Sequence, residues 1–482
     1  AGDALNIEAK RDVQLSGLVE RDKTSERGYQ RNHTSSLRTG SWSNSNETES
    51  LKGSDLRAGG DLTLTAGNML ETQGAKAHAG RNLTANDNDR ININVQKTAN
   101  AKTVRDNKTS WGGIGGGNNQ DNSNRSEVSN ATELTADGTL RLNGQQGVTI
   151  TGSKVRGKQG GFVEATSGGL RIDNALSTTV DKVDARTGTV FNITSSSQKS
   201  NNSHQQSTAS ELVSDTNLQL VSKQDTDVVG SKVTRTVKLD INAGGTINVS
   251  SGEQQQLIDE QKTALAINGY ANEKGDKQSR AGFRIEHTSD SEKTTRNEQQ
   301  SSTLSGGSVA LKADKDVTFS GSNLVTTQGD ASISGDNVSF LAAENKTTSD
   351  TEQTKVGGGF YYTGGIDKVG SGIEGGYENS KTHAQNSKAV TSASDVKGNL
   401  TINAKDKLTQ QGAQHQAGGK YQENANSVAH LAATDSESSS TRKTDVGVDI
   451  GANVDYSAIS RPVERAVGKA AKLDVNGAIN DI

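Results

Sequence analysis

Apolar and polar residues follow a fifteen-residue pattern that returns six times along the chain. The second and fourth positions are aliphatic in every copy, as in Leu62 and Leu64, which places both side chains on one face of a strand. The tenth position is aliphatic in five copies and is Thr226 in the fourth copy. The pattern predicts a strand, a corner, a shorter strand and a second corner, which together form one side of a coil. The copies occupy residues 4–18, 61–75, 139–153, 217–231, 308–322 and 399–413.

The fourteenth position of the pattern is glycine in every copy. These glycines are expected to be structural corners, because glycine suits a tight bend that needs a positive φ. Successive corner glycines are 57, 78, 78, 91 and 91 residues apart. Such spacing is typical of a repeat array, whose units fold by stacking on their neighbours. The six residues are Gly17, Gly74, Gly152, Gly230, Gly321 and Gly412.

A weaker echo of the pattern follows some copies about one coil later. Leu83 lies 21 residues after Leu62, and Phe162 lies 22 residues after Leu140. Ala331 similarly follows the fifth copy. A coil of roughly 20–25 residues falls within the range of solenoids, and the absence of helical stretches favours a parallel β-helix. Since parallel crossovers are nearly always right-handed, the predicted fold is all-β, a right-handed parallel β-helix over residues 1–457.

Long polar stretches separate the copies, for example at residues 195–210 and 287–302. They can be interpreted as disordered loops or as pairs of polar strands that project from the helix. Alternation in RININV at 90–95 and GFRIEH at 282–287 favours strand pairs, which we expect to pack on the rod or on each other. The increase in spacing from 78 to 91 residues predicts longer protrusions in the second half of the chain.

Composition narrows the class of protein. Hydrophobic residues are 29% and aromatic residues 3% of the chain, values usual for disorder, but a thin solenoid core needs few apolar residues per coil. A net charge of −4 gives no electrostatic basis for nucleic-acid binding. The lack of cysteine suits a chain exported unfolded, and no apolar stretch reaches the length of a membrane-spanning helix. The chain starts partway through a repeat, so we expect a segment of a longer protein.

Residues 458–482 differ in composition from the repeats. Pro462 opens a helix-compatible run that ends near Leu473. This stretch is therefore predicted to be a linker or the start of a following module.

The copies DLTLTAGNMLETQGA and NLTINAKDKLTQQGA, with their polar tails, resemble haemagglutinin repeats of filamentous haemagglutinin-like proteins, the large passengers of two-partner secretion. Units of 78–91 residues with GGG-containing tails are more similar to the second repeat region of contact-dependent growth inhibition (CdiA-type) effectors. The resemblance covers roughly residues 1–457. It implies a β-helical rod that an outer-membrane partner transporter secretes to the surface of a Gram-negative bacterium. The rod would engage the target-cell outer membrane or a surface receptor and support delivery of a C-terminal toxin that lies in cis outside this segment.

Two other functions remain open: an adhesin that binds host or bacterial surface glycans, and a polysaccharide-degrading β-helix enzyme. The enzyme would need clustered carboxylates, or a calcium site beside a basic residue, on adjacent coils. Acidic pairs such as Asp87/Asp89 and Asp314/Asp316 do not recur at a shared position next to Arg or Lys. Seven histidines without zinc-site spacing, and no cysteine, do not indicate a metal site. The sequence therefore predicts no catalytic residue, no metal, no cofactor and no enzymatic activity.

Aromatic residues are few, and those in the polar tails include Trp42, Trp111 and the run Phe360, Tyr361 and Tyr362. They can be interpreted as local packing over a strand pair, or as a contact site for a membrane, a glycan or a partner chain. Alternation in VGGGFYYTGGIDKVGSGIEGGYE at 356–378 also allows the hypothesis of membrane-spanning strands after rearrangement. Any specific function is expected in the polar tails or beyond the ends of the chain.

Overall fold

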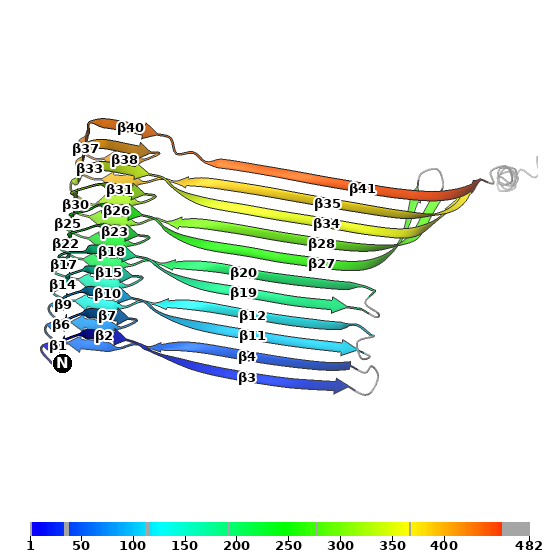
Figure 1. Cartoon of the computed structure of the whole chain (residues 1–482), viewed down its shortest axis with the longest axis horizontal. Coiled ribbons are helices and arrows are strands. Elements are labelled where there is room, and N and C mark those ends of the chain that lie inside the picture. The colour runs from blue at the N-terminus through cyan, green and yellow to red at the C-terminus, as the bar shows by residue number, and fades with distance from the viewer. Residues whose placement is uncertain are drawn as a thin grey trace, which may run out of the picture.

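The computed structural model describes residues 2–32, 38–110, 115–189, 193–274, 278–365 and 368–455. Trp111 and the predicted linker or module at 458–482 lie outside the described residues. Every element of the described part is a β-strand. The strands build two bodies: a β-helix at the left of Figure 1 and a sheet of long hairpins that projects from it to the right.

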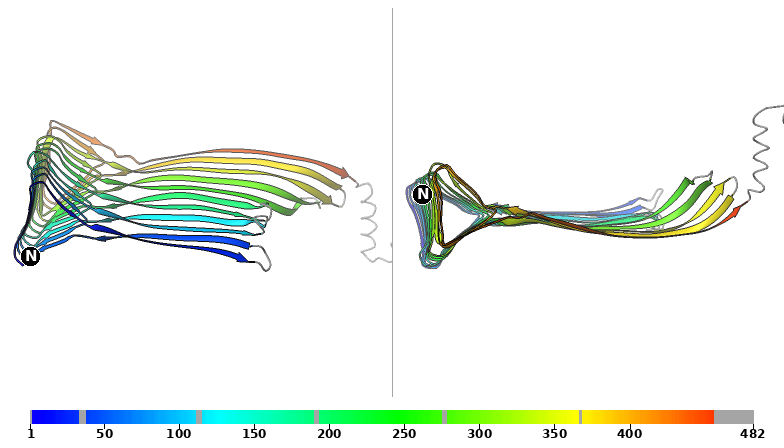
Figure 2. Two further views of the ribbon diagram at one scale, coloured as in Figure 1. Left: turned by 60° about the horizontal axis from the view of Figure 1, so that its bottom comes forward. Right: turned by 90° about the horizontal axis from the view of Figure 1, so that it is seen from above.

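The β-helix consists of three stacks of parallel strands. Strand β6 (Leu62–Ala66) pairs with β9 (Leu83–Asp87) in the first stack, and β7 (Met69–Gln73) pairs with β10 (Arg90–Asn94) in the second. The third stack contains β8 (Lys76–Ala79) on β13 (Glu133–Ala136). Seen from above, the three stacks enclose a triangle (Figure 2). The predicted all-β, right-handed parallel β-helix is confirmed.

The remaining strands of the β-helix repeat this arrangement. The first stack also contains β1 (Leu5–Ala9), β14 (Thr139–Gly144), β17 (Gly160–Ala165), β22 (Asn217–Ser222), β25 (Lys238–Ala243), β30 (Ser308–Ala313) and β39 (Tyr421–Asn424). The second stack contains β2 (Asp12–Ser16), β15 (Gly147–Thr151), β18 (Gly169–Asp173), β23 (Thr226–Val229), β26 (Ile247–Ser250), β31 (Val317–Ser320) and β40 (Ser427–Leu431). The longer β33 (Ala331–Leu341) and β37 (Leu400–Gln411) run through both of these stacks. The third stack is completed by β5 (Asp55–Ala58), β16 (Lys154–Gly157), β21 (Glu211–Ser214), β24 (Lys232–Arg235), β29 (Thr303–Gly306), β32 (Asn323–Thr326), β36 (Ala393–Val396) and β38 (Gln414–Ala417).

Each fifteen-residue copy forms two of the three sides of a coil, and the prediction of one side was wrong. In the second copy β6 ends at Ala66 and β7 begins at Met69, so the corner between them is already a corner of the coil. The aliphatic positions of both strands point inward, and Leu62, Leu64 and Leu70 are fully buried. One pattern therefore supplies inward side chains to two walls of the same core.

The echo expected at Phe162 is shifted by one residue. Leu140 pairs with Gly161, and Arg141 pairs with Phe162, so Phe162 points outward. The guanidinium of Arg141 lies 4.6 Å from the centre of its ring. A shift of one residue turns a strand side chain to the other face, and the inward position of this coil is taken by glycine. The echoes at Leu83 and Ala331 pair as the spacing predicts.

The polar stretches are antiparallel hairpins, as the alternation in GFRIEH of β28 predicts, and they pack on each other rather than on the rod. The assignment of RININV to such a strand pair was wrong, because residues 90–94 form β10 of the β-helix. The hairpins form one 11-stranded sheet in the order β3-β4-β11-β12-β19-β20-β27-β28-β34-β35-β41. The first three hairpins have strands of 14–15 residues: β3 (Leu18–Asn32), β4 (Arg38–Lys52), β11 (Gln96–Ser110), β12 (Gly117–Asn130), β19 (Ala175–Gly188) and β20 (Ser195–Thr208). The next two have strands of 23 residues: β27 (Gly252–Lys274), β28 (Gln278–Gln300), β34 (Ala343–Gly365) and β35 (Lys368–Val390). The edge strand β41 (Ser436–Asp455) has 20 residues, and the predicted longer protrusions are confirmed.

Hairpins leave the β-helix only on alternate coils. Paired residues are 21 positions apart across a coil without a hairpin, as in Leu62 and Leu83, and 57 apart across a coil with a short hairpin, as in Leu83 and Leu140. Across a coil with a long hairpin they are 70 apart, as in Leu239 and Val309. Stacked coils and neighbouring hairpin strands share the same spacing of about 4.8 Å. Two coils therefore advance along the rod by the width of one two-stranded hairpin. This match lets all hairpins join into a continuous sheet without gaps or crowding (Figure 1).

Five of the six corner glycines have φ between 53° and 60°, and Gly17 is the exception. The five lie on coils without a hairpin, where the chain turns sharply beside the roots of neighbouring hairpins. At Gly152 a methyl group would stand 2.5 Å from Cβ of Ala175 and 2.7 Å from Cγ1 of Val95. The coil of Gly17 carries a hairpin, so the chain continues directly into β3 and needs no left-handed turn. The first copy is thus one coil from the second, which explains the spacing of 57 residues.

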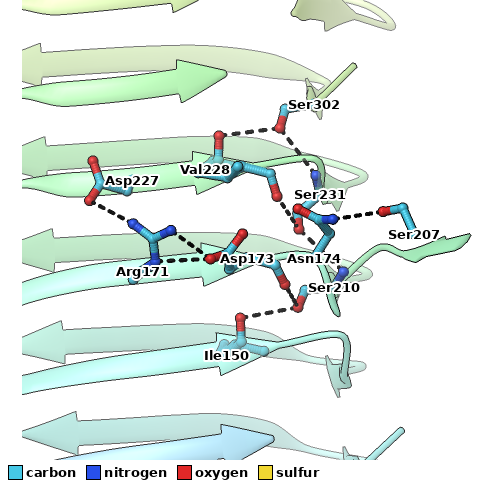
Figure 3. Close-up of polar contacts among 11 residues, drawn as sticks. Ile150, Arg171, Asp173, Asn174, Ser207, Ser210, Asp227, Val228, Ser231 and Ser302 are labelled. Atoms are coloured by element: carbon cyan, nitrogen blue, oxygen red, sulfur yellow. Dashed lines mark hydrogen bonds and ion pairs between the residues drawn. The ribbon is translucent and has the colours of Figure 1, made fainter. Parts of the chain in front are cut away.

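Buried serines close the coil where a hairpin returns to it (Figure 3). The Oγ of Ser210 lies 2.6 Å from the carbonyl oxygen of Asp173 and 3.1 Å from that of Ile150. Ser302 occupies the same place two coils later, with its Oγ 2.7 Å from the carbonyl oxygen of Ser250. Both serines are fully buried. The carbonyl groups of Asp173 and Ser250 also accept a backbone N–H, so the serines add a second donor to them. Each serine hydroxyl in turn accepts a buried backbone N–H, from Ser153 and Ser231 respectively.

Candidate functional site

The hairpin sheet is a single layer that projects from one corner of the β-helix (Figure 2). Over the length of the short hairpins both faces are largely polar, and many charged side chains are paired across strands. Arg105 of β11, for example, lies 2.9 Å from Asp121 of β12. Such exposed ion pairs add little stability individually, so this part of the sheet is held mainly by its backbone hydrogen bonds.

Beyond the tips of the short hairpins the sheet becomes strongly amphipathic. Ser195, at the end of β20, pairs with Leu265 of β27, and past this level β27, β28, β34, β35 and β41 continue. Phe360 pairs with Phe283 on one side and Ile373 on the other, which in turn pairs with Ile450. Paired residues project from the same face. The apolar tip face defined by this register comprises Ile267, Phe283, Ile285, Val356, Phe360, Tyr362, Ile373, Tyr377, Val446, Val448, Ile450 and Val454, all of them exposed.

The apolar tip face is large for a surface in contact with water. It extends about 27 Å along the strands and about 20 Å across them, from the usual rise and spacing of strands, which gives about 500 Å². The exposed fractions of Phe283 and Phe360 are 69% and 74%. Its three central rows contain only apolar residues, glycine, serine and Tyr362. The largest contiguous apolar patch on a soluble protein is often a functional surface at this size.

The reverse face of the tip carries a charge cluster with one residue from each of the five strands. Arg280 lies 2.7 Å from Glu374 and 3.0 Å from Asp449, and its guanidinium stands 3.5 Å from the centre of the Tyr361 ring. Tyr270 donates to Glu374 at 3.0 Å, and burial together with this carboxylate raises the pKa of Tyr270. The two faces of the same strands therefore differ in chemistry: one is apolar, and the other holds paired charges.

The glycines on the reverse face make room for the cluster. A methyl group on Gly372 or Gly451 would collide with the phenol of Tyr361, which lies across both strands. Glycine in a strand interior often marks the close approach of another group. The glycine-rich pattern of residues 356–378 thus accommodates the aromatic and charged side chains of neighbouring strands.

The aromatic residues predicted from sequence as a possible contact site fall on two faces. Phe360 and Tyr362 belong to the apolar tip face, whereas Tyr361 belongs to the charge cluster. Trp42 is 44% exposed in the first hairpin, and the strand register places it on the face of Tyr361. The sequence interpretation missed Phe283 and Ile450, because only the register between hairpins brings them beside Phe360 and Ile373. Alternation aligned among 281–285, 358–362, 371–377 and 446–454 is the signal that could have identified them.

Side chains of the acidic pairs considered for catalysis accept hydrogen bonds at the corners of coils. Asp87 is buried and accepts the backbone N–H of Asp89, and burial raises the pKa of Asp87. Asp316 accepts two hydrogen bonds from Asn337, at 3.1 and 2.8 Å. Within the described ranges, no three His, Asp or Glu side chains are grouped so that they could hold a metal ion. In the same ranges no helix has the length and hydrophobicity needed to cross a membrane.

Comparison with known proteins identifies the family. A hemolysin of Serratia marcescens is 72% identical, and a hemolysin of Proteus mirabilis 51% identical, over the whole chain. The tRNA nuclease CdiA-2 of Burkholderia pseudomallei strain 1026b is 24% identical over 88% of the chain. The chain spans 30% and 31% of the two hemolysins and 13% of the nuclease. No solved structure matches the chain.

The hemagglutinin repeat family matches residues 35–178, 191–367 and 373–476. These ranges cover both the coils of the β-helix and the hairpins between them. The chain therefore belongs to the hemagglutinin repeat family, within the filamentous haemagglutinin-like proteins of two-partner secretion.

Proposed function

We propose that this segment is the rod of a secreted cell-surface exoprotein and that it presents its hairpin sheet to the envelope of a target cell. The observation that carries the proposal is the apolar tip face, an exposed apolar surface on strands that reach past the other hairpins. The two relatives that align with the whole chain are named hemolysins, and this name fits contact with a cell membrane. The repeated core positions contain no recurring acid, base or metal ligand, so we assign them to scaffold and propose no enzymatic activity.

The remaining parts of the proposal come from the family and concern the longer protein. We propose export through an outer-membrane partner transporter, and support for a C-terminal toxin that lies in cis outside this segment. One relative carries the name of a tRNA nuclease, which is a toxin-like activity of that protein. We also propose that residues 1–457 form the rod, whose corners are shaped by the corner glycines. Residues 458–482 would form a linker or the start of a following module.

Sedimentation with outer-membrane vesicles of a target bacterium tests the envelope contact. We expect the purified chain to be retained, and the Phe283→Ser, Phe360→Ser double variant to bind at least about tenfold more weakly, because two large apolar side chains lose their burial. Trp42→Ser is the control, since it removes an exposed aromatic residue from the opposite face of a short hairpin. Failure of the unaltered chain to bind, or equal loss in the control, would contradict the proposal.

A glycan-binding adhesin is the second candidate, and Trp42 is the observation that favours it. Its indole lies across Gly28, which has no side chain to cover the ring, and Gln30, Arg38 and Asp106 line the same hollow. An exposed aromatic face among hydrogen-bonding side chains is suited to a sugar ring. The prediction is that Trp42→Ala abolishes binding to surface polysaccharide and leaves retention on outer-membrane vesicles intact. Polysaccharide binding that is independent of Trp42 would contradict this assignment.

A further inference from the structure

We propose that the partner of the apolar tip face is lipid, and that the tip enters one leaflet of a bilayer by this face alone. The inference rests on the proposed envelope contact and names its partner. It also specifies the orientation: Phe283, Phe360 and Ile450 point into the acyl chains, while Arg280 and the rest of the charge cluster remain in water. The tip then lies along the membrane surface and does not span it.

The chemistry of the apolar tip face favours lipid over a protein or a glycan. Recognition of a protein or a sugar uses hydrogen-bonding groups placed among the apolar contacts to fix the orientation of the ligand. The central rows of this face offer only the hydroxyl groups of Tyr362 and Ser371, and they contain no charged residue. Binding of hydrocarbon chains requires an apolar surface but no surface shape that is complementary to the ligand. A flat sheet of exposed Phe, Ile and Val supplies such a surface.

The reverse face must remain outside the hydrocarbon. Arg280, Glu374 and Asp449 form ion pairs there, and two of the three side chains, those of Arg280 and Glu374, are already largely shielded within the cluster. Moving such a cluster from water into acyl chains is costly, because charged groups lose their hydration even when they are paired. An orientation with one face in lipid and the other in water avoids this cost.

The edge of the tip argues against a spanning arrangement. The partner strand β20 pairs with β27 only as far as Leu265, so residues 266–274 have one backbone edge without a strand partner in the described part of the chain. Every backbone polar group inside the hydrocarbon must have a hydrogen-bond partner. At the surface, water and headgroups can satisfy this edge, and apolar side chains enter the acyl region by about 5–10 Å. For these five strands we therefore propose one-sided insertion in place of the membrane-spanning strands that the sequence alternation had suggested.

Single-cysteine labelling tests the orientation directly, because the chain has no cysteine of its own. Phe360→Cys and Thr363→Cys place an environment-sensitive fluorophore on opposite faces of β34. On liposomes of phosphatidylcholine and phosphatidylethanolamine, the label at 360 should gain emission several-fold and be quenched by brominated acyl chains. The label at 363 should be quenched by iodide added outside. Lipid quenching of both labels, or of neither, would overturn one-sided insertion.

The affinity for the same liposomes separates this inference from the proposed function. The Phe283→Ser, Phe360→Ser double variant should bind at least about tenfold more weakly. Tyr29→Ser should bind normally, because Tyr29 is 67% exposed on the same face of the sheet but lies in the first short hairpin. Circular dichroism of each variant checks that the sheet is intact. Retention on outer-membrane vesicles without binding to protein-free liposomes overturns the lipid assignment alone, and retention on neither overturns the envelope contact as well.

Discussion

Replacement of Gly152 by alanine should destabilise its coil by about 2–5 kcal/mol. The residue has φ of 57°, and an L-residue in the left-handed region costs about 1–2 kcal/mol. The new Cβ would stand 2.5 Å from Cβ of Ala175 and 2.7 Å from Cγ1 of Val95, well inside the usual contact distance of about 3.5–4.0 Å. Overpacking of this kind costs about 1–3 kcal/mol. Both costs arise at the root of a hairpin, so the hairpin and its coil should loosen together.

Hydrogen exchange followed by mass spectrometry is the suitable assay, because a solenoid opens locally and a global melting midpoint averages over many units. Loss of at least 2 kcal/mol should speed exchange in β15, β16 and β18 about thirtyfold or more. Gly17→Ala is the matched control: it has the same place in the pattern and no positive φ, and its new Cβ would meet mainly the movable end of the Leu51 side chain, with Cα of Gly53 at 3.2 Å as the nearest backbone atom. Equal exchange in the two variants would refute the argument from the left-handed corner.

Four further predictions concern the core and the repeat. Ser302→Ala should cost about 1–3 kcal/mol, seen as faster exchange at the root of β27 and β28, because the buried N–H of Ser231 loses its acceptor and the carbonyl group of Ser250 loses one of its two donors. Arg235→Met should raise the thermal midpoint by removing a buried guanidinium whose Nε and Nη2 have no hydrogen-bond partner among the described residues and whose pKa burial lowers to about 10. Burial lowers the pKa of His415, so the unfolded state takes up a proton more readily than the folded state as the pH falls through the usual histidine range near about 6.5. The last coils should therefore exchange faster at pH 5 than at pH 8, after correction for intrinsic rates, and His415→Phe should remove the difference. Deletion of residues 153–230 should leave a folded rod about 10 Å shorter by small-angle scattering, and loss of the β-sheet signal in circular dichroism would contradict the stacking of independent units.

The fold could be predicted from the sequence because the residue pattern that specifies each strand is local. Leu62 and Leu64 alternate within one strand, and the same alternation recurs at a fixed distance, so periodicity alone predicts stacked strands. The glycine in each copy marks a corner, but its conformation depends on whether a hairpin leaves that coil. Gly17 and Gly152 are equivalent in sequence and different in structure for this reason. The position of the hairpins relative to the coils was therefore the missing variable. The outward position of Phe162 has a different cause, a register one residue shorter than its distance from Leu140 suggests.

The candidate site was only partly predictable, because its residues come from two separate hairpins and the edge strand β41. Phe360 and Tyr362 stand out as aromatic residues in a polar chain, but their neighbours Phe283 and Ile450 lie more than 70 residues away in sequence. The assignment of Tyr361 to the opposite face follows from strand alternation and was available from the start. The ion pairs of Arg280 were not, because they depend on the register of the strands that surround it.

The matching widths of coil pairs and hairpins also constrain how such a gene can change in length. In-frame duplication or loss of a two-coil unit keeps the stacked coils and the hairpin strands in register, because two coils and one hairpin advance by the same distance along the rod. Insertion of one coil alone would shift every later hairpin along the rod by the width of one strand, so that it no longer meets the edge of the preceding hairpin. Recombination within the repeats should therefore yield proteins whose rods differ by even numbers of coils, with each viable product adding or removing one complete hairpin.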